Sequence, residues 1–320
     1  MYYTFIVNPA ARSGLGHLIW QKTESLLKAH NIPYQAHLTC YQRHATRLAR
    51  EITQDKKEHT LIVLGGDGTL NETVNGIVYP SLTVLGYIPI GSGNDFARFF
   101  HLPSDPEQAL ELILKNHAFA FMDIGNLSFK QRSRRFCVST GLGFDAAICH
   151  QAVISRVKKW MNRLHLGKLT YALIALDRLR FLRPADFTVT CDGQPPRSYQ
   201  NCLFAVIMNH PYEGGGFQFC PKADPCDGRL DIIIISGITK WRALLLLPLA
   251  LKGRHTKCLG ISVFSCRTVT IESSLPLPVH TDGEPVYLQS ILQAELLTDR
   301  LRVIVPESFH KTEEKEKKIS

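Results

Sequence analysis

As far as about residue 124, the chain alternates between short apolar runs and stretches whose apolar residues recur at helical spacing. The runs predict strands at 3–7, 34–38, 60–64 and 82–88, and the stretches predict helices at 18–30, 45–54, 70–78 and 106–115. In the first helix, the expected inward positions are Leu18, Trp20, Leu26 and Leu27. Strands that alternate with helices indicate a parallel sheet covered on both faces.

Beyond residue 124 the pattern changes to short strand-like runs separated by turn signals such as Asp192-Gly193, Asp227-Gly228 and Asp282-Gly283. This arrangement is typical of an antiparallel sandwich or barrel. The runs lie at 136–140, 187–191, 201–209, 230–235, 261–264, 268–272, 293–297 and 301–305. One helical insertion is expected within this part, from about Ala147 to Leu182.

Length and composition favour two globular domains, because 320 residues exceed the usual size of one hydrophobic core. The nine cysteines include no C-x-x-C pair, so free thiols are expected rather than disulfides or a zinc site. The longest apolar stretch, from Ala243 to Leu251, is shorter than the roughly 20 residues that span a bilayer. Since the start shows no signal-peptide pattern, we expect a soluble, cytoplasmic protein.

The net charge of +9 fits three classes of partner: nucleic acid, an anionic membrane, or a phosphate-rich ligand. Charge alone does not choose among them. The basic residues are dispersed, and no helix-turn-helix, zinc finger or aromatic RNA-binding motif occurs, which argues against a nucleic-acid partner.

The glycine-rich segment Gly65-Gly66-Asp67-Gly68-Thr69 falls between an expected strand and an expected helix. Glycines let the backbone approach a phosphate closely, and the first N–H groups of a helix attract anions. The carboxylate of Asp67 could hold a magnesium ion that bridges phosphates. The alternative is a plain tight turn.

Two further loops follow strands of the same expected sheet, at Asn8 to Gly14 and at Pro89 to Arg98. Because ligands of open α/β sheets bind at the carboxyl ends of strands, three such loops predict a nucleotide cleft. The loops match neither the G-x-x-x-x-G-K-[ST] phosphate loop nor the dinucleotide fingerprint G-x-G-x-x-G.

Together these motifs resemble the diacylglycerol kinase catalytic-domain family, which includes bacterial diacylglycerol kinases, other lipid kinases and sphingosine kinases. The resemblance runs nearly end to end. It includes Asn8-Pro9, Thr39 with His44, 65–72, 91–95, 121–125, 141–145, Asn209 with 214–216, 221–223, 227–231 and 282–284. Ser92 stands where the family usually has threonine and keeps the hydroxyl group.

The resemblance implies an α/β domain like those of phosphofructokinases and NAD kinases, followed by a β-sandwich domain. The first would cover 1–124 and be completed by a returning segment at about 298–320, and the second would cover 125–297. ATP would lie between the two domains. Its expected contacts are Asn8, Pro9, Ala10, Ala11, Arg12, Thr39, Gly65, Gly66, Asp67, Gly68, Thr69, Leu70, Asn71, Glu72 and Ser92.

The resemblance also implies the catalytic and metal-binding residues. Asp67, Asp95 and Asp123 would form a carboxylate network around the catalytic Mg²⁺, and Glu284 would accept the proton of the lipid hydroxyl, with Asp67 as the alternative base. From sequence alone, Asp282-Gly283 could equally be a hairpin turn with Glu284 exposed. A second, structural magnesium site would use Asp227 with the backbone carbonyls of Asp224 and Arg229, and its alternative is an Asp-Gly turn.

The expected activity is transfer of the ATP γ-phosphate to a lipid hydroxyl, with diacylglycerol as the first substrate candidate and phosphatidylglycerol or a sphingoid base as alternatives. An NAD kinase-like enzyme is a competing interpretation, and a non-enzymatic basic binding protein is another. Basic residues interleaved with apolar ones at 156–183, and the run at 130–135, could dock on an anionic membrane. An ordinary helix with a solvated face is the alternative, and a homodimer is compatible with the resemblance.

Overall fold

The computed structural model describes residues 2–115, 118–129, 132–143, 146 and 183–309. The expected helical insertion at 147–182 lies outside the described residues, as does most of the basic segment expected to dock on membranes. The chain divides into two compact units. Unit 1 comprises Met1–Asp123 and Thr298–Ser320, and unit 2 comprises Ile124–Leu297.

Unit 1 is built on a sheet with the strand order β2-β1-β3-β4-β19-β5. All neighbouring strands are parallel except β5, which runs antiparallel to β19. The strands are β1 Tyr3–Val7, β2 Tyr34–Leu38, β3 His59–Gly65, β4 Thr83–Pro89, β5 Phe119–Met122 and β19 Leu301–Ile304. Because β19 lies between β4 and β5, the end of the described chain returns to complete the first sheet.

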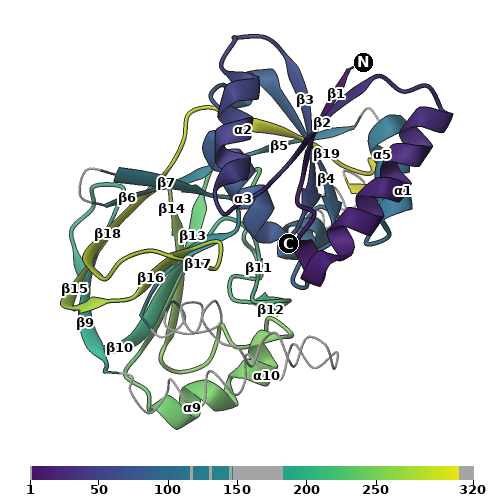
Figure 1. Cartoon of the computed structure of the whole chain (residues 1–320). Helices are drawn as coiled ribbons and strands as arrows, with labels where there is room; N and C mark the ends of the chain where they lie inside the picture. Colours follow the sequence, from purple (N-terminus) through teal and green to yellow (C-terminus); the bar gives the residue numbers. More distant parts are fainter. Residues whose placement is uncertain (1, 116–117, 130–131, 144–145, 147–182, 310–320) are drawn as a thin grey trace. The chain divides into compact units, whose positions relative to one another are not determined.

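Helices cover both faces of this sheet, as the alternating pattern predicted. Figure 1 shows α1 and α5 over one face and α2 and α3 over the other. The helices are α1 Leu15–Ala29, α2 His44–Thr53, α3 Asp67–Gly76, α4 Asp95–Phe99 and α5 Pro106–Lys115, with short 3-10 turns at Ala11–Gly14 and Pro80–Leu82. Buried side chains from β1, β3 and β4 pack against Trp20 and Leu27 of α1 and against Ile113 of α5.

The inward face of α1 differs from the predicted one. Trp20 and Leu27 are buried, Leu26 is partly buried, and Leu18 is 56% exposed. The buried stripe of the helix passes through Gly16, Trp20, Thr23 and Leu27. Gly16 fits because a Cβ at this position would lie 2.3 Å from the carbonyl oxygen of Asn8. This close approach of the loop sets the rotation of the helix and leaves Leu18 outside.

Unit 2 is a curled antiparallel sheet with the strand order β17-β16-β8-β10-β9-β15-β18-β6-β7, from which β13 and β14 branch at β10. The strands are β6 Gly125–Phe129, β7 Arg132–Phe136, β8 Ser139–Gly143, β9 Ala185–Cys191, β10 Arg197–Met208, β13 Leu230–Ser236, β14 Ile261–Cys266, β15 Thr268–Leu277, β16 Val279–Thr281, β17 Glu284–Pro285 and β18 Gln289–Leu296. A small hairpin joins β11 Tyr212–Glu213 to β12 Phe217–Gln218.

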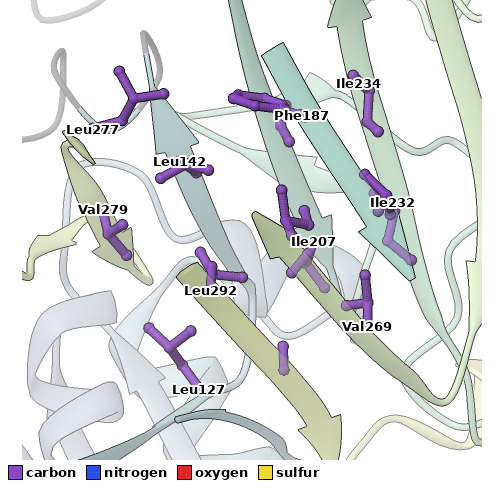
Figure 2. Close-up of a cluster of buried hydrophobic side chains, with 14 of the residues drawn as sticks. Leu127, Leu142, Phe187, Ile207, Ile232, Ile234, Val269, Leu277, Val279 and Leu292 are labelled. Carbon is purple, nitrogen blue, oxygen red and sulfur yellow. The ribbon is translucent and has the colours of Figure 1, made fainter. Parts of the chain in front are cut away.

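The long strand β10 curls this sheet because it changes partners along its length. Its first part pairs with β9, and after a register irregularity its second part pairs with β8 and β13. Figure 2 shows side chains such as Leu142, Phe187 and Ile232 gathered in one apolar interior. The expected fold class, an α/β domain followed by an antiparallel β-sandwich-like domain, is confirmed.

Two short helices in unit 2 differ from the strand-dominated expectation. They are α9 Lys240–Leu245 and α10 Leu247–Ala250, on either side of Leu246. From the sequence, the stretch from Ala243 to Leu251 was notable only for its apolar length. Within the described part of the chain, no helix combines the length and apolar character required to cross a membrane.

Candidate functional site

The loops after β3 and β4 meet at one edge of the unit 1 sheet. The backbone N–H of Ile90 donates to the carbonyl of Gly65 at 2.8 Å, and the N–H of Asn94 donates to Oδ2 of Asp67 at 2.8 Å. A Cβ on Gly91 would lie 2.9 Å from the Cα of Gly66, so only glycine permits this approach. The prediction that these two glycine-rich loops lie together is confirmed.

The loop after β1 joins them. Nδ2 of Asn8 donates to Oγ1 of Thr69 at 2.9 Å, and the Asn8 N–H donates to the carbonyl of Leu64 at 2.9 Å. The N–H of Thr39 donates to the carbonyl oxygen of Val7 at 2.8 Å, which places Thr39 beside the end of β1. Asn8, Thr39 and Thr69 therefore lie at the same edge of the sheet as the two glycine-rich loops.

Helix α3 begins within the first glycine-rich loop, at Asp67 and not at Leu70 as predicted. Its N-cap residue, Gly66, has an extended backbone and supplies no side-chain cap. A helix N-terminus of this kind attracts an anion through its first N–H groups and the helix dipole. The side chains of Leu70 and Asn71 are both 1% exposed, so they face the interior and not the loop surface.

The remaining expected ATP contacts lie on the outside of these loops. Pro9 and Glu72 are half-buried, whereas Ala10, Arg12 and Ser92 are exposed. Oε1 of Glu72 accepts the N–H of Arg43 at 2.8 Å, which ties α3 to the segment before α2. Arg12 and the next two residues have left-handed backbone angles, which fold this loop sharply before α1.

Two carboxylates lie close to Gly93. A Cβ built on this glycine would come within 3.1 Å of Oδ2 of Asp67 and within 3.8 Å of Oδ2 of Asp95. Asp95 is 6% exposed, and its Oδ1 accepts a 2.7 Å hydrogen bond from Nη1 of Arg98. The space that a side chain would fill at Gly93 is thus bordered by two anionic oxygen atoms.

The pair of carboxylates from Asp67 and Asp95 is too small to coordinate a metal ion by itself, but it suits magnesium, which also binds substrate phosphates. Magnesium in phosphate-transferring sites is commonly held by one or two carboxylates together with substrate phosphates. Among the described residues, no group of three or more His, Cys, Asp or Glu side chains could hold a metal. Asp67 and Asp95 lie beside an open N-terminal helix end and could hold such an ion together with substrate phosphates, and their role in metal binding stays a prediction.

Tyr87 belongs to this site, although the sequence analysis did not single it out. Its ring packs edge-to-face against Phe96, and its hydroxyl is buried with no hydrogen-bond partner among the described residues. Burial raises the pKa of Tyr87 well above its ordinary value, and the nearby charges of Asp67 and Asp95 raise it further. The phenol therefore stays protonated beside the carboxylates. No signal in the sequence marks it, because it occupies an apolar-looking position on a buried strand.

Asp123 does not share the edge that carries Asp67 and Asp95. It follows β5, and its Oδ1 pairs with Nε of Arg300 at 2.7 Å. Leu301 pairs with Met122, and Arg302 pairs with Val84 near the beginning of β4. Asp67 and Asp95 instead follow the ends of β3 and β4. Because β5 is antiparallel to its neighbour, its carboxyl end meets the opposite edge of the sheet.

In unit 2, the turn that carries Glu284 is held by the carboxylate before it. Oδ2 of Asp282 accepts the N–H of Cys137, and Oδ1 accepts the N–H groups of Val138 and Ser139, at 2.8, 2.8 and 2.9 Å. Asp282 and Gly283 both have positive φ angles, 47° and 76°, which form a tight hairpin between β16 and β17. Glu284, half-buried, is the first residue of β17.

A buried polar group supports the same turn from inside. Nδ1 of His280 accepts the N–H of Gly283 at 3.2 Å, so the ring proton resides on Nε2. Nε2 lies 3.4 Å from Oε1 of Glu213, which also accepts a 2.8 Å hydrogen bond from Oγ of Ser139. Glu213 immediately precedes the triple glycine at 214–216, so two motifs of the second domain meet here.

Replacing Asp282 with alanine is expected to reduce the free energy of unfolding by about 3 kcal/mol, because three backbone donors lose a shared acceptor. Denaturant unfolding followed by circular dichroism measures this change. Asp192→Ala is the matched comparison. Asp192 also accepts two backbone N–H groups, from Arg267 and Thr268, but it is exposed and water can replace it. An equal loss in both variants would contradict the special role of the Asp282 turn.

The expected structural magnesium site has a compact turn geometry. Oδ1 of Asp224 accepts the N–H of Cys226 at 2.9 Å, and Oδ1 of Asp227 accepts the N–H of Arg229 at 2.8 Å. The carbonyl of Asp224 accepts the N–H of Asp227 at 3.3 Å. These bonds hold the segment as consecutive Asp-initiated turns, and magnesium binding at this segment stays a prediction.

Comparison with known proteins agrees with this two-part arrangement. Residues 2–127 match the model of the diacylglycerol kinase catalytic domain, and residues 141–305 match that of the YegS C-terminal NAD kinase beta sandwich-like domain. The chain is 32% identical over 290 residues to the Bacillus subtilis protein named "Putative lipid kinase YtlR", covering 88% of this chain and 93% of that protein. It is 29% identical over 226 residues to a Staphylococcus carnosus diacylglycerol kinase, covering 70% of this chain and 69% of the relative.

Among solved structures, a Bacillus anthracis protein described as a "putative diacylglycerol kinase" superposes with a TM-score of 0.74 at 25% identity. The match covers 96% of both chains. The two family models, the full-length relative and the shared fold agree with the glycine-rich loops and the β-domain turn described above. The chain therefore belongs to the diacylglycerol kinase family of lipid kinases, which are ATP-using phosphotransferases.

Proposed function

We propose that this protein transfers the γ-phosphate of ATP to the hydroxyl group of diacylglycerol, producing phosphatidic acid. The Staphylococcus carnosus relative and the Bacillus anthracis structure carry that substrate in their names, which supports the choice of lipid. The observation that carries the proposal is the Asp67–Asp95 pair around Gly93, next to the N-terminus of α3.

In this proposal, the loops of unit 1 hold the nucleotide. The backbone of residues 65–69 and the N-terminus of α3 would bind the phosphates. Asn8 and Thr69, joined by a 2.9 Å hydrogen bond, would fix the first loop against α3. Thr39, Arg12 and Ser92 would contribute from the same edge. Because phosphoryl transfer depends mainly on positioning and charge neutralisation, these contacts supply much of the catalysis.

Asp67 and Asp95 would hold magnesium in the space beside Gly93. When bound, the ion neutralises charge on the transferring phosphate oxygens. Arg98 keeps the Asp95 carboxylate in place through its 2.7 Å ion pair. Metal-binding roles for Asp123 and for the Asp224–Arg229 turn stay expectations from the family resemblance. The register of β5 with β19 argues against a site that Asp123 shares with Asp67 and Asp95.

Glu284 is proposed as the general base, and Asp67 remains the alternative. The lipid hydroxyl oxygen would attack the γ-phosphorus, the hydroxyl proton would pass to the Glu284 carboxylate, and ADP would leave with the bridging oxygen. The turn that presents Glu284 is fixed by Asp282 on one side and by His280 on the other. The backbone that carries the proposed base is therefore ordered before substrate arrives.

The lipid specificity is tested by radiolabelled ATP and a panel of acceptors in mixed micelles. Diacylglycerol is expected to be phosphorylated at least about tenfold faster than phosphatidylglycerol or a sphingoid base, corresponding to about 1.4 kcal/mol of discrimination. NAD in solution is expected to give no product. Preferred phosphorylation of any other acceptor would reassign the substrate and leave the family membership unchanged.

A further inference from the structure

In unit 2, the helices α9 and α10 and the loop after them carry exposed apolar side chains interleaved with basic residues. The apolar members are Trp241, Leu245, Leu249, Leu251 and Leu259, with exposed fractions of 66%, 77%, 38%, 45% and 73%. The cationic members are the exposed Arg242, Lys252, Arg254 and Lys257 and the half-buried Lys240. We call these ten residues the α9–α10 surface. Large apolar side chains seldom gather on a surface that faces only water.

The two helices are anchored on their inner side and left uncovered on their outer side. Ala243 and Leu244 pack against the apolar cluster that contains Leu203 and Phe204, whereas Trp241 and Leu245 are one helical turn apart on the outside. The hydroxyl of Thr239 accepts the N–H of Arg242 at 3.3 Å and caps α9. The exposed side chains therefore project from a helix that the fold fixes in place.

The segment after α10 folds back toward the same helices. The N–H groups of Lys252 and Arg254 both donate to the carbonyl of Leu249 at 3.0 Å. A Cβ on Gly260 would lie 2.2 Å from Cγ2 of Ile238, which places neighbouring Leu259 beside the residues that lead into α9. These contacts thus hold the loop that follows α10 close to the two helices.

The charge of this surface is wholly positive. No Asp or Glu occurs between Asp231 and Glu272 in the sequence. Within the part of the chain that the structure describes, none of the five cations forms an ion pair. Aromatic and leucine side chains surrounded by uncompensated lysine and arginine complement a bilayer with anionic headgroups.

We propose that the α9–α10 surface docks the protein on an anionic lipid bilayer, with Trp241 and Leu245 inserted at the headgroup boundary and the cations on lipid phosphates. The proposal rests on the proposed function, since a diacylglycerol substrate resides in the membrane. The α9–α10 surface is distinct from the two basic segments, 156–183 and 130–135, that the sequence offered as possible docking sites.

Vesicle sedimentation with the full chain tests the surface. Binding to vesicles of phosphatidylcholine mixed with phosphatidylglycerol is expected to exceed binding to phosphatidylcholine alone. The double variant Lys252→Gln/Arg254→Gln is expected to weaken it by roughly 30-fold, from about fivefold per cation. Trp241→Ala/Leu245→Ala is expected to weaken it by at least about tenfold. The matched controls, Lys22→Gln/Lys56→Gln and Leu18→Ala/Ile291→Ala, change exposed residues elsewhere and should bind normally.

Tryptophan fluorescence separates the two docking segments. Vesicles that contain lipids with brominated acyl chains are expected to quench the wild-type protein and Trp160→Phe, and to quench Trp241→Phe much less. Trp20 is 5% exposed and serves as a constant background. Quenching that disappears only in Trp160→Phe would overturn the proposal. The proposal is also overturned if Trp241→Ala/Leu245→Ala sediments with vesicles as the wild type does. It is overturned as well if this variant changes the oligomeric state and leaves vesicle binding unchanged.

Failure of docking and failure of the proposed activity give different results. On short-chain diacylglycerol dissolved as monomers, the surface variants are expected to turn over at the wild-type rate, because no membrane is involved. A loss there would assign the surface to catalysis or folding and overturn docking. If the wild type binds anionic vesicles but phosphorylates no diacylglycerol, the substrate assignment fails and docking stands.

Discussion

Asp67→Asn is expected to lower phosphoryl transfer by at least about 1,000-fold while leaving the fold intact, because a metal-holding charge next to the transferred phosphate is lost. Asparagine keeps an oxygen that can accept the 2.8 Å hydrogen bond from the N–H of Asn94, so the two loops stay joined. The measurement is the initial rate of ATP-dependent lipid phosphorylation at saturating magnesium. Unfolding temperature by circular dichroism checks the fold.

Gly93→Ala is an independent variant at the same position in space. Its Cβ would stand 3.1 Å from Oδ2 of Asp67 and 3.8 Å from Oδ2 of Asp95, where the metal is expected. The backbone at Gly93 does not have a positive φ, so alanine adds bulk without conformational strain. A weaker response to added Mn²⁺ in electron paramagnetic resonance is therefore expected. Asp299→Asn, an exposed carboxylate of the same unit, is the control. Normal metal binding by the Gly93→Ala variant would contradict the assignment of magnesium to this site.

Glu284→Gln is expected to reduce kcat by about 100- to 10,000-fold, the usual contribution of a general base. The KM for ATP should stay unchanged, because the nucleotide contacts of the proposal belong to unit 1. Glutamine preserves the size of the side chain, and the hydrogen bonds of Asp282 and His280 continue to hold the turn.

The control for this variant is Glu295→Gln, which neutralises an exposed carboxylate on β18 of the same unit. Its turnover should equal that of the wild type. If Glu284→Gln retains normal turnover, the proton passes elsewhere, and Asp67 becomes the base. If Glu284→Gln instead raises the KM for lipid and leaves kcat unchanged, Glu284 is a substrate-binding residue.

The turn residues around Glu284 show how far local sequence signals reach. The dipeptide Asp282-Gly283 predicts a tight hairpin, because glycine and aspartate tolerate positive φ angles. What the Asp282 carboxylate binds lies more than 140 positions earlier in the chain, at Cys137 to Ser139. No local pattern specifies that partner, so only the folded sheet distinguishes a structural clamp from an ordinary turn.

For the carboxylates of unit 1, too, the sequence predicts part of the arrangement and the folded sheet decides the rest. Asp67 and Asp95 follow buried parallel strands, and their proximity could be expected from the rule that such strands end at one edge. Asp123 also follows an apolar strand, so its sequence context looks equivalent. The direction of β5 separates it from the pair, and that direction depends on pairing with β19 from the far end of the chain.

By itself, the sequence determined the alternation of helices and strands in unit 1, the strand-rich character of unit 2, which loops can approach phosphates and which family the motifs resemble. These properties depend on the spacing of apolar residues and on glycine backbone freedom, both of which are local. Only the tertiary structure decided the edge at which Asp123 lies, the partners of Asp282, the presence of Tyr87 beside the carboxylates and the exposure of Trp241 and Leu245. Each of these depends on contacts between distant segments, because strand direction and burial are set by neighbours in space.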